Sequence, residues 1–161
     1  MPYLTAVCNE TLRLYPAAPT TARHAIKPTT VGTHYIPRGT QACISPWAIN
    51  RNRALWGADA DKYNPARWLD GPNAATGGAT SPYALLTFLH GPRSCIGQSF
   101  ARTEMKCLLA ALVMRFRFEL AEPDQKVEVG GFITIKPHNG LRLILYDLKA
   151  EAEAKAKAES E

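Results

Sequence analysis

The sequence has few cysteines and no pair of them at metal-binding spacing. Its four cysteines stand at positions 8, 43, 95 and 107, with no Cys-x-x-Cys motif and no His or Cys companion at zinc-finger spacing. We therefore expect no structural zinc site. The cysteines do not form the pattern of a disulfide framework, and no secretory signal stands at the start of the sequence. A reducing, intracellular compartment is the expected location.

Long apolar runs and a phosphate-binding loop are also missing. No run approaches the roughly 18 to 20 apolar residues of a membrane span, and the longest extends from Cys107 to Met114. We expect this chain to be soluble or at most peripheral to a membrane. The Gly77-Gly78 pair is not followed by Gly-Lys-Ser/Thr, so it is not a phosphate loop.

The net charge of +5 is unevenly distributed. From Asp147 onward three lysines stand against five acidic residues, so the residues before Asp147 carry a net charge of +7. Much of this positive charge is expected near the cysteine at position 95, in Arg93, Arg102, Lys106, Arg115 and Arg117. A basic face would suit an acidic protein partner. Nucleic acid is the rival interpretation, but the sequence holds no recognition motif for it. A solvated helix face explains these charges equally well.

The stretch Phe88-Leu-His-Gly-Pro-Arg-Ser-Cys-Ile-Gly97 puts a cysteine in a setting that favours a thiolate. Arg93 stands two residues before Cys95, and an amphipathic helix pattern begins at about Gln98. A nearby cation and the N–H groups at a helix start lower the pKa of a thiol. A bound metal would hold the thiol deprotonated. Cys95 is therefore a candidate metal ligand.

The neighbours of Cys95 each have a physical role in this hypothesis. Gly91 permits a tight turn at positive φ, and Gly97 lets the backbone lie flat against a planar ligand. The N–H groups of Gly97 and its two neighbours would point at the sulfur and moderate its charge. Arg93 would bind a carboxylate of the ligand with its planar fork, and Phe88 would exclude water. The alternative is that Cys95 is a small buried hydrophobic residue, as most lone cysteines are.

These residues resemble the haem-binding signature of the cytochromes P450, Phe-x-x-Gly-x-Arg-x-Cys-x-Gly, at every fixed position. With five fixed residues, each at roughly one in fifteen to twenty by composition, a chance match in a chain of this length is on the order of one in ten thousand. The resemblance implies that Cys95 is the axial thiolate ligand of a haem b iron. It also implies that the cofactor is bound by Phe88, Gly91, Arg93 and Gly97.

A predicted helix from Pro2 to Tyr15 carries a second signature. Its apolar residues recur at helical spacing, and Pro16 ends it. Glu10 and Arg13 share a face of this helix, since they are three residues apart. On the residues alone such a pair is usually solvated and weak. With Leu-Tyr-Pro behind it, however, Glu-Thr-Leu-Arg resembles the Glu-x-x-Arg signature of the same family, in which the pair is buried and structural.

A third segment, Asn64-Pro-Ala-Arg-Trp-Leu-Asp70, resembles the family's Pro-x-Arg-(Phe/Trp) element. Ala66 stands where Glu is usual. The resemblance implies that Arg67 completes a structural triad with Glu10 and Arg13.

Residues 17–46 contain prolines, glycines and short β-type runs, and Val31 to Ile44 predicts a hairpin. The family has a small sheet here. The resemblance assigns Arg23 as a second arginine that binds a haem propionate. His24 and His34 are iron-ligand candidates by residue type only, because lone histidines in strands and loops are mostly structural or exposed.

The last third of the chain predicts one long helix, three strands and a charged tail. The helix extends from Gln98 to Phe116, and we expect its N-terminus to face the sulfur. Its apolar stripe, which we expect in the core, consists of Ala101, Met105, Leu108, Leu109, Leu112, Val113 and Phe116. The strands cover residues 117–121, 131–136 and 141–146, with a turn at 137–140. Phe132 and Ile133 are candidate substrate-pocket residues by resemblance, although core packing explains them better.

The predicted fold is α+β, mainly α: residues 1–148 form the C-terminal haem-binding part of a cytochrome P450-like domain, and residues 149–161 form an Ala/Glu/Lys tail without assigned function. The resemblance implies a haem-thiolate monooxygenase that inserts one oxygen atom from O2 into a small organic substrate. It further implies an NADPH-dependent reductase as electron donor and, for the full-length protein, the endoplasmic reticulum membrane.

The family's oxygen-activation motif, Ala/Gly-Gly-x-Asp/Glu-Thr, is not in the sequence. We therefore expect an N-terminally truncated fragment that is not competent by itself. The alternative is a non-catalytic chain that binds haem or a protein partner without turnover.

Overall fold

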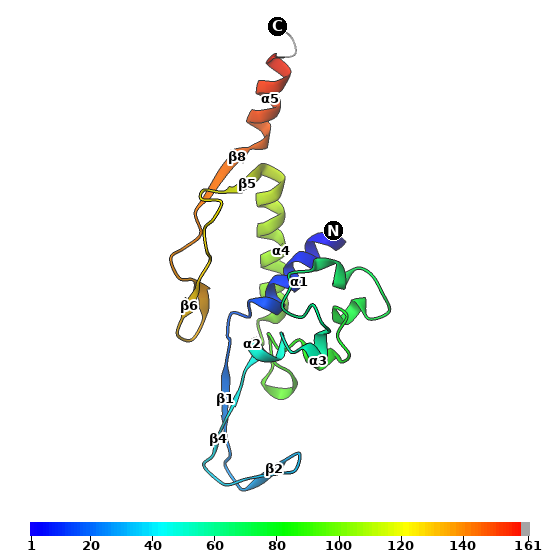
Figure 1. The fold of residues 1–161 in the computed structure, drawn as a ribbon, viewed down its shortest axis with the longest axis vertical. Coiled ribbons are helices and arrows are strands. Elements are labelled where there is room, and N and C mark those ends of the chain that lie inside the picture. Colours follow the sequence, from blue (N-terminus) through cyan, green and yellow to red (C-terminus); the bar gives the residue numbers. More distant parts are fainter. Residues whose placement is uncertain (159–161) are drawn as a thin grey trace.

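The computed structural model describes residues 1–158, and its core lies around the helix α1 (Pro2–Leu14). Pro2 stands in the first turn of α1, where its missing N–H costs no hydrogen bond. The helix ends one residue earlier than predicted. Ala6, Cys8 and Leu14 of α1 are buried. The helix α1 packs against both η1 (Pro65–Trp68), in the irregular middle of the chain, and the later helix α4 (Gln98–Arg115) (Figure 1).

The segment after α1 forms two short antiparallel sheets where one hairpin was predicted. β1 (Thr21–His24) pairs with β4 (Gln41–Ile44), and between them β2 (Thr29–Val31) pairs with β3 (His34–Ile36). The predicted hairpin over residues 31–44 is therefore wrong in its pairing, because its two strands pair with earlier segments. These strands extend away from α1 (Figure 1).

The middle of the chain consists of single helical turns. They are α2 (Pro46–Ile49), α3 (Arg53–Trp56), η1 (Pro65–Trp68), η2 (Ala74–Thr76), η3 (Pro82–Ala84) and η4 (Gly91–Arg93). Ser45 and Asn52 cap α2 and α3, as their side-chain oxygens accept backbone N–H groups. A small hydrophobic cluster of Trp56, Ala60, Ala79 and Ala84 holds these turns together.

The predicted long helix is present as α4 (Gln98–Arg115), with 18 residues and a length of about 27 Å. Its predicted core stripe is wrong for the described chain, because no residue of α4 is buried. Leu108, Leu112 and Val113 are 59, 43 and 45% exposed. The physical reason is that α1 packs on α4, but among the described residues this packing leaves the apolar side chains of the later turns largely exposed.

The chain after α4 forms two further antiparallel pairs. β5 (Phe116–Leu120) pairs with β8 (Leu143–Asp147), and β6 (Val129–Gly131) pairs with β7 (Ile135–Pro137). The prediction of one strand over residues 131–136 is wrong. Gly131 has a φ of +135°, so the chain turns there and the segment becomes a hairpin tip. Phe132 and Ile133 are 97 and 76% exposed on this tip, in neither a core nor a pocket.

The tail continues from β8 as the helix α5 (Leu148–Ala158). The Asp147 carboxylate accepts the N–H groups of Lys149 and Ala150 at the start of this helix. The predicted tail over residues 149–161 is helical as far as Ala158, and its last residues lie outside the described part. Within residues 1–158, no helix combines the length and the apolar character needed to cross a membrane.

Candidate functional site

The cysteine loop, residues 88–97, is closed by a hydrogen bond between its ends. The N–H of Cys95 donates to the carbonyl oxygen of Phe88 at 2.8 Å, and the N–H of Ser94 donates to Gly91 at 3.0 Å. Gly91 has a φ of +74°, the left-handed conformation that its position predicted. Cys95 is exposed, so the alternative that it is a small buried hydrophobic residue is wrong for this structure.

Cys95 lies beside the start of α4, as expected. A Cβ atom added to Gly97 would lie 3.9 Å from the sulfur of Cys95, so this glycine leaves one side of the sulfur open. The N–H of Gln98 donates to the carbonyl oxygen of Cys95 at 3.3 Å. The prediction that this N–H points at the sulfur is therefore wrong for Gln98.

Arg23 and Arg93 come from distant parts of the sequence and line the same cavity. This cavity has a volume of about 260 Å³ and is otherwise lined by Ile44, Leu86, Leu89, His90 and Pro92. Arg23 Nη1 donates to Thr21 Oγ1 at 3.1 Å and to the carbonyl oxygen of Ala22 at 2.8 Å. Two exposed guanidinium groups beside an apolar cavity suit a ligand with an apolar body and carboxylate groups.

His90 belongs to this cavity but was missed by the sequence analysis. Its Nε2 lies 3.1 Å from the carbonyl oxygen of Leu85, and its ring packs edge-on against Tyr83 at 5.0 Å. The available signal was its place between Phe88 and Gly91 inside the cysteine stretch. His24 and His34 are exposed on β1 and β3, and residues 1–158 contain no cluster of three metal-binding side chains.

Glu10, Arg13 and Arg67 are brought together at the centre of the molecule. Arg13 Nε and Nη2 donate to the two oxygens of Glu10 at 2.9 and 2.8 Å, and Arg67 Nε donates to Glu10 at 3.1 Å. The side chains of Glu10 and Arg13 have no exposed surface, and that of Arg67 is 6% exposed. Arg67 also donates to Asp59 at 2.8 Å. The pair is therefore buried and structural, in contrast to the solvated surface pair that the two residues alone suggested.

Asn50 connects this network to the cysteine loop, and nothing in its sequence context marked it. Its Nδ2 donates to the carbonyl oxygen of Arg13 and to Thr87 Oγ1, both at 2.9 Å, and its Oδ1 accepts the N–H of Leu86 at 2.8 Å. Thr87 Oγ1 donates to the carbonyl oxygen of Leu12 at 2.7 Å. Phe88 follows Thr87 directly, so these bonds attach the start of the cysteine loop to α1.

The prediction of a basic face around Cys95 is wrong for Arg115 and Arg117. Arg115 and Arg117 lie at the opposite end of α4 from Cys95, since the helix separates them by its full length. There Arg115 pairs with Asp147 at 3.4 Å, and Arg117 pairs with Glu119 and Glu151. These cations neutralise nearby carboxylates instead of adding to a free basic surface.

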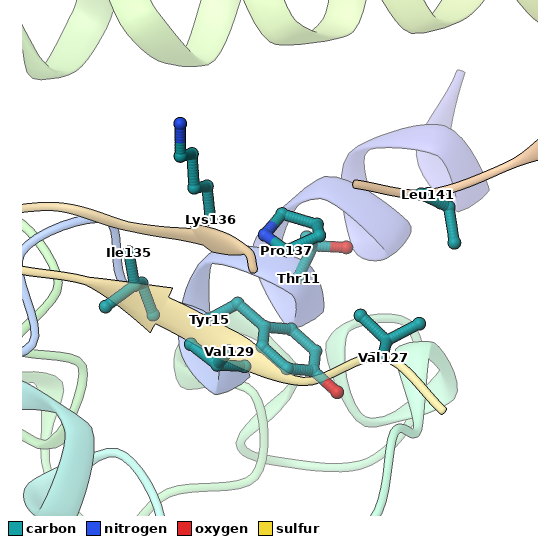
Figure 2. Close-up of a pocket in the computed structure, with 8 residues that line it drawn as sticks. All are labelled: Thr11, Tyr15, Val127, Val129, Ile135, Lys136, Pro137 and Leu141. Carbon is teal, nitrogen blue, oxygen red and sulfur yellow. The ribbon is translucent and has the colours of Figure 1, made fainter. Parts of the chain in front are cut away.

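A second cavity, of about 350 Å³, lies between α1 and the β6–β7 hairpin (Figure 2). It is lined by Thr11, Tyr15, Val127, Val129, Ile135, Lys136, Pro137 and Leu141. In Figure 2 the Lys136 side chain extends away from the apolar members. None of the predicted site residues lines this cavity.

The comparisons with known proteins agree on one family. The sequence profile of the family described as "Cytochrome P450" matches residues 1–142. The cytochrome P450 monooxygenase sphH of Aspergillus fumigatus is 55% identical over 141 residues, which cover 88% of this chain and 26% of the relative. The cytochrome P450 monooxygenase abl5 of Leptosphaeria maculans is 44% identical over 158 residues, covering 92% of this chain and 29% of that protein.

The fold is also similar to that of a solved structure. The retinoic acid-bound cyanobacterial CYP120A1 matches with a TM-score of 0.80 and 30% identity, over 92% of this chain and 33% of that chain. The chain thus spans between about a quarter and a third of the length of these relatives.

Proposed function

The chain belongs to the cytochrome P450 family, and from this membership we propose that it is the haem-binding part of a monooxygenase. We assign this role to residues 1–148, with residues 149–161 as a tail. The observation that carries the proposal is the exposed sulfur of Cys95 on a closed loop. The reaction is the insertion of one oxygen atom from O2 into a small organic substrate.

The residues around Cys95 fit haem b. A soft thiolate donor suits iron, and the glycine beside the sulfur has no side chain to obstruct a planar ligand. The cavity that Arg23 and Arg93 share offers two cations for two propionates beside an apolar lining. When bound, haem held by the Cys95 thiolate would supply the O2 chemistry of the reaction, because a thiolate donates electron density to the iron.

The residues of this chain hold and insulate that thiolate. The Cys95 N–H bond to Phe88 fixes the loop on which the sulfur stands. The positive end of the α4 dipole lies beside the sulfur, which favours its anionic form. Phe88 is half-buried and would exclude water from the bound cofactor. Arg23 and Arg93 orient the cofactor through its carboxylates.

Family membership also supports proposals about the whole protein. Its electron donor would be an NADPH-dependent reductase, and the full-length protein would reside at the endoplasmic reticulum membrane. Retinoic acid is a ligand of the cyanobacterial relative. The substrate proposed for this protein is a small organic molecule, without a further assignment.

The experiment loads the expressed chain with hemin and records the ferrous–CO difference spectrum. We expect a Soret band at the position typical of thiolate ligation, and its loss in Cys95→Ser. Cys107→Ser is the matched control, because Cys107 is also exposed but lies on α4 away from the loop. A band that persists in Cys95→Ser would contradict the proposal, as would the absence of any such band in the unchanged chain.

A further inference from the structure

Arg102 is a partly buried cation that the proposed function does not use. It stands in the second turn of α4, and its Nε is buried without a hydrogen-bond partner. Within residues 1–158, no carboxylate lies within ion-pair distance of its guanidinium. Burial lowers the pKa of Arg102 below its ordinary value. A charge removed from water without an anion is unfavourable, so its contacts require an explanation.

The contacts of Arg102 join α1 to the cysteine loop. Its Nη1 donates to Asn9 Oδ1 on α1 at 3.4 Å. Its guanidinium carbon lies 5.4 Å from the centre of the Phe88 ring, within the range of a cation–π interaction. The carbonyl oxygen of the same Phe88 accepts the N–H of Cys95 at 2.8 Å. A single residue, Phe88, thus separates Arg102 from the backbone of Cys95.

The charge of Arg102 matters for this arrangement. A cation–π interaction becomes stronger where water is excluded, as it is around the buried Nε. An apolar side chain of similar length would fill the same space without the desolvation penalty, but it would attract the ring less. The charge of the guanidinium therefore adds to packing in the attraction between Arg102 and the Phe88 ring.

We propose that Arg102 is a positioning residue, which fixes Phe88 and, through the Cys95–Phe88 hydrogen bond, the loop that carries the thiolate. The part of this inference that concerns haem rests on the proposed function. A cation on this side of the loop also stabilises the added negative charge when a bound iron is reduced, so it raises the midpoint potential.

The first test needs no haem. Hydrogen exchange of the peptide that covers residues 88–97 is measured in the unchanged chain, Arg102→Met and Arg102→Lys. We expect exchange at the Cys95 amide to become about tenfold faster in Arg102→Met, with partial rescue by Arg102→Lys because it restores a cation. Arg115→Met is the matched control, since Arg115 is 69% exposed at the other end of α4.

Amides of α1 serve as an internal reference in these samples. Faster exchange that is confined to the cysteine loop supports positioning, whereas equal acceleration in α1 means a general loss of stability and overturns the proposal. Unchanged exchange at Cys95 in Arg102→Met overturns it as well.

The second test uses the hemin-loaded chain and measures the ferric–ferrous midpoint potential. We expect a lower potential in Arg102→Met than in the unchanged chain, with Arg102→Lys between them and Arg115→Met unchanged. Equal midpoint potentials in all variants overturn the inference that the charge of Arg102 raises the potential. If the unchanged chain does not bind hemin, the proposed function fails, and the exchange experiment still decides the role of Arg102.

Discussion

Arg13 holds both oxygens of the Glu10 carboxylate, with Nε donating to Oε2 at 2.9 Å and Nη2 donating to Oε1 at 2.8 Å. Neither side chain has any exposed surface. Arg13 Nη1 donates further to the carbonyl oxygens of Asn50 at 2.7 Å and Ala60 at 2.5 Å. Nη2 also donates to the carbonyl oxygen of Lys62 at 3.0 Å. The bidentate pair therefore attaches α1 to the irregular middle of the chain.

Replacement of Glu10 by glutamine tests this arrangement. Glu10→Gln removes the one anion within residues 1–158 that Arg13 contacts, and it leaves that guanidinium buried without a counter-charge. Breaking a buried ion pair in this way costs about 3 to 5 kcal/mol in the free energy of unfolding, which urea denaturation measures. Glu104→Gln is the control, because Glu104 is exposed on α4, and we expect its effect to stay within about 0.5 kcal/mol. Similar values for both variants would contradict the prediction.

The same carboxylate makes stability depend on pH. Burial by itself would raise the pKa of Glu10, but hydrogen bonds from Arg13, the N–H of Asn64 and Trp68, with the charge of Arg13, lower it below the ordinary 4.5. Because the pKa in the folded state is below the pKa in the unfolded state, this stabilisation is complete above about pH 4.5. It is lost as the pH falls through the folded-state pKa.

Urea denaturation at pH values from about 6 to about 3, which span the ordinary pKa range of carboxyl groups, measures this dependence. We expect the free energy of unfolding to fall more steeply in the unchanged chain than in Glu10→Gln, since only the unchanged chain can protonate this group. Asp59, whose pKa is also lowered, shares Arg67 with Glu10, so the difference between the curves reports Glu10 together with its coupling to Asp59. Parallel curves would mean that Glu10 is not the titrating group.

Arg67 and Arg53 offer a comparison between a buried and an exposed ion pair. Arg67 is 6% exposed and bridges Glu10 and Asp59, whereas Arg53 and Asp61 are 70 and 58% exposed. Arg67→Met leaves the buried side of this network without one of its cations, so we expect a loss of about 3 kcal/mol. For Arg53→Met we expect at most about 0.5 kcal/mol. The same denaturation experiment ranks them, and the reverse order would refute the structural role assigned to Arg67.

Local signals explain why the two long helices were predicted nearly to the residue. Apolar spacing and Pro16 mark the end of α1, and the cysteine stretch marks the start of α4. The triad needed more than local pattern, because Arg67 is far from Glu10 in sequence. Only resemblance to a family indicated that these residues meet.

Tertiary packing explains what the sequence did not predict. Asn50 is an ordinary polar residue in the sequence, and its importance arises only because Arg13, Leu86 and Thr87 surround it. The apolar stripe of α4 indicates that a face should be covered but does not indicate by what. The strand prediction over residues 131–136 failed because alternation of side chains cannot reveal the positive φ of a glycine within it.

Because Arg23 and Arg93 line one cavity, we predict that hemin binding depends on the carboxylates of the ligand. Both side chains are exposed, so Arg23→Gln and Arg93→Gln should change stability little, but each should weaken hemin binding about tenfold through loss of a charge-assisted hydrogen bond. Absorbance titration measures the affinity. Hemin dimethyl ester, which lacks the free carboxylates, should bind the variants and the unchanged chain alike. Arg38→Gln, an exposed arginine outside the cavity, should not alter either affinity. Equal losses for hemin and its ester would exclude a carboxylate contact.

Substitution of two glycines in the last third of the chain distinguishes the cost of backbone strain from the cost of a steric clash. Gly131 and Gly140 both have positive φ, at +135° and +73°. A Cβ atom at Gly140 meets nothing within 4 Å, whereas at Gly131 it would clash with the backbone carbonyl oxygen of Thr134. Gly140→Ala should therefore cost only about 1 to 2 kcal/mol from the left-handed conformation, but Gly131→Ala should open the β6–β7 hairpin.

Hydrogen exchange at Ile135 reports this opening. Ile135 lies opposite Gly131 in the hairpin, and its N–H donates to the carbonyl oxygen of Ala17 at 2.9 Å. Once the hairpin opens, this N–H loses its acceptor and exchanges rapidly. We therefore expect fast exchange at Ile135 in Gly131→Ala and nearly unchanged exchange in Gly140→Ala. Protection of Ile135 in Gly131→Ala would mean that the hairpin accommodates the added methyl group by a backbone shift, and that the contact between Ala17 and β7 does not depend on this turn.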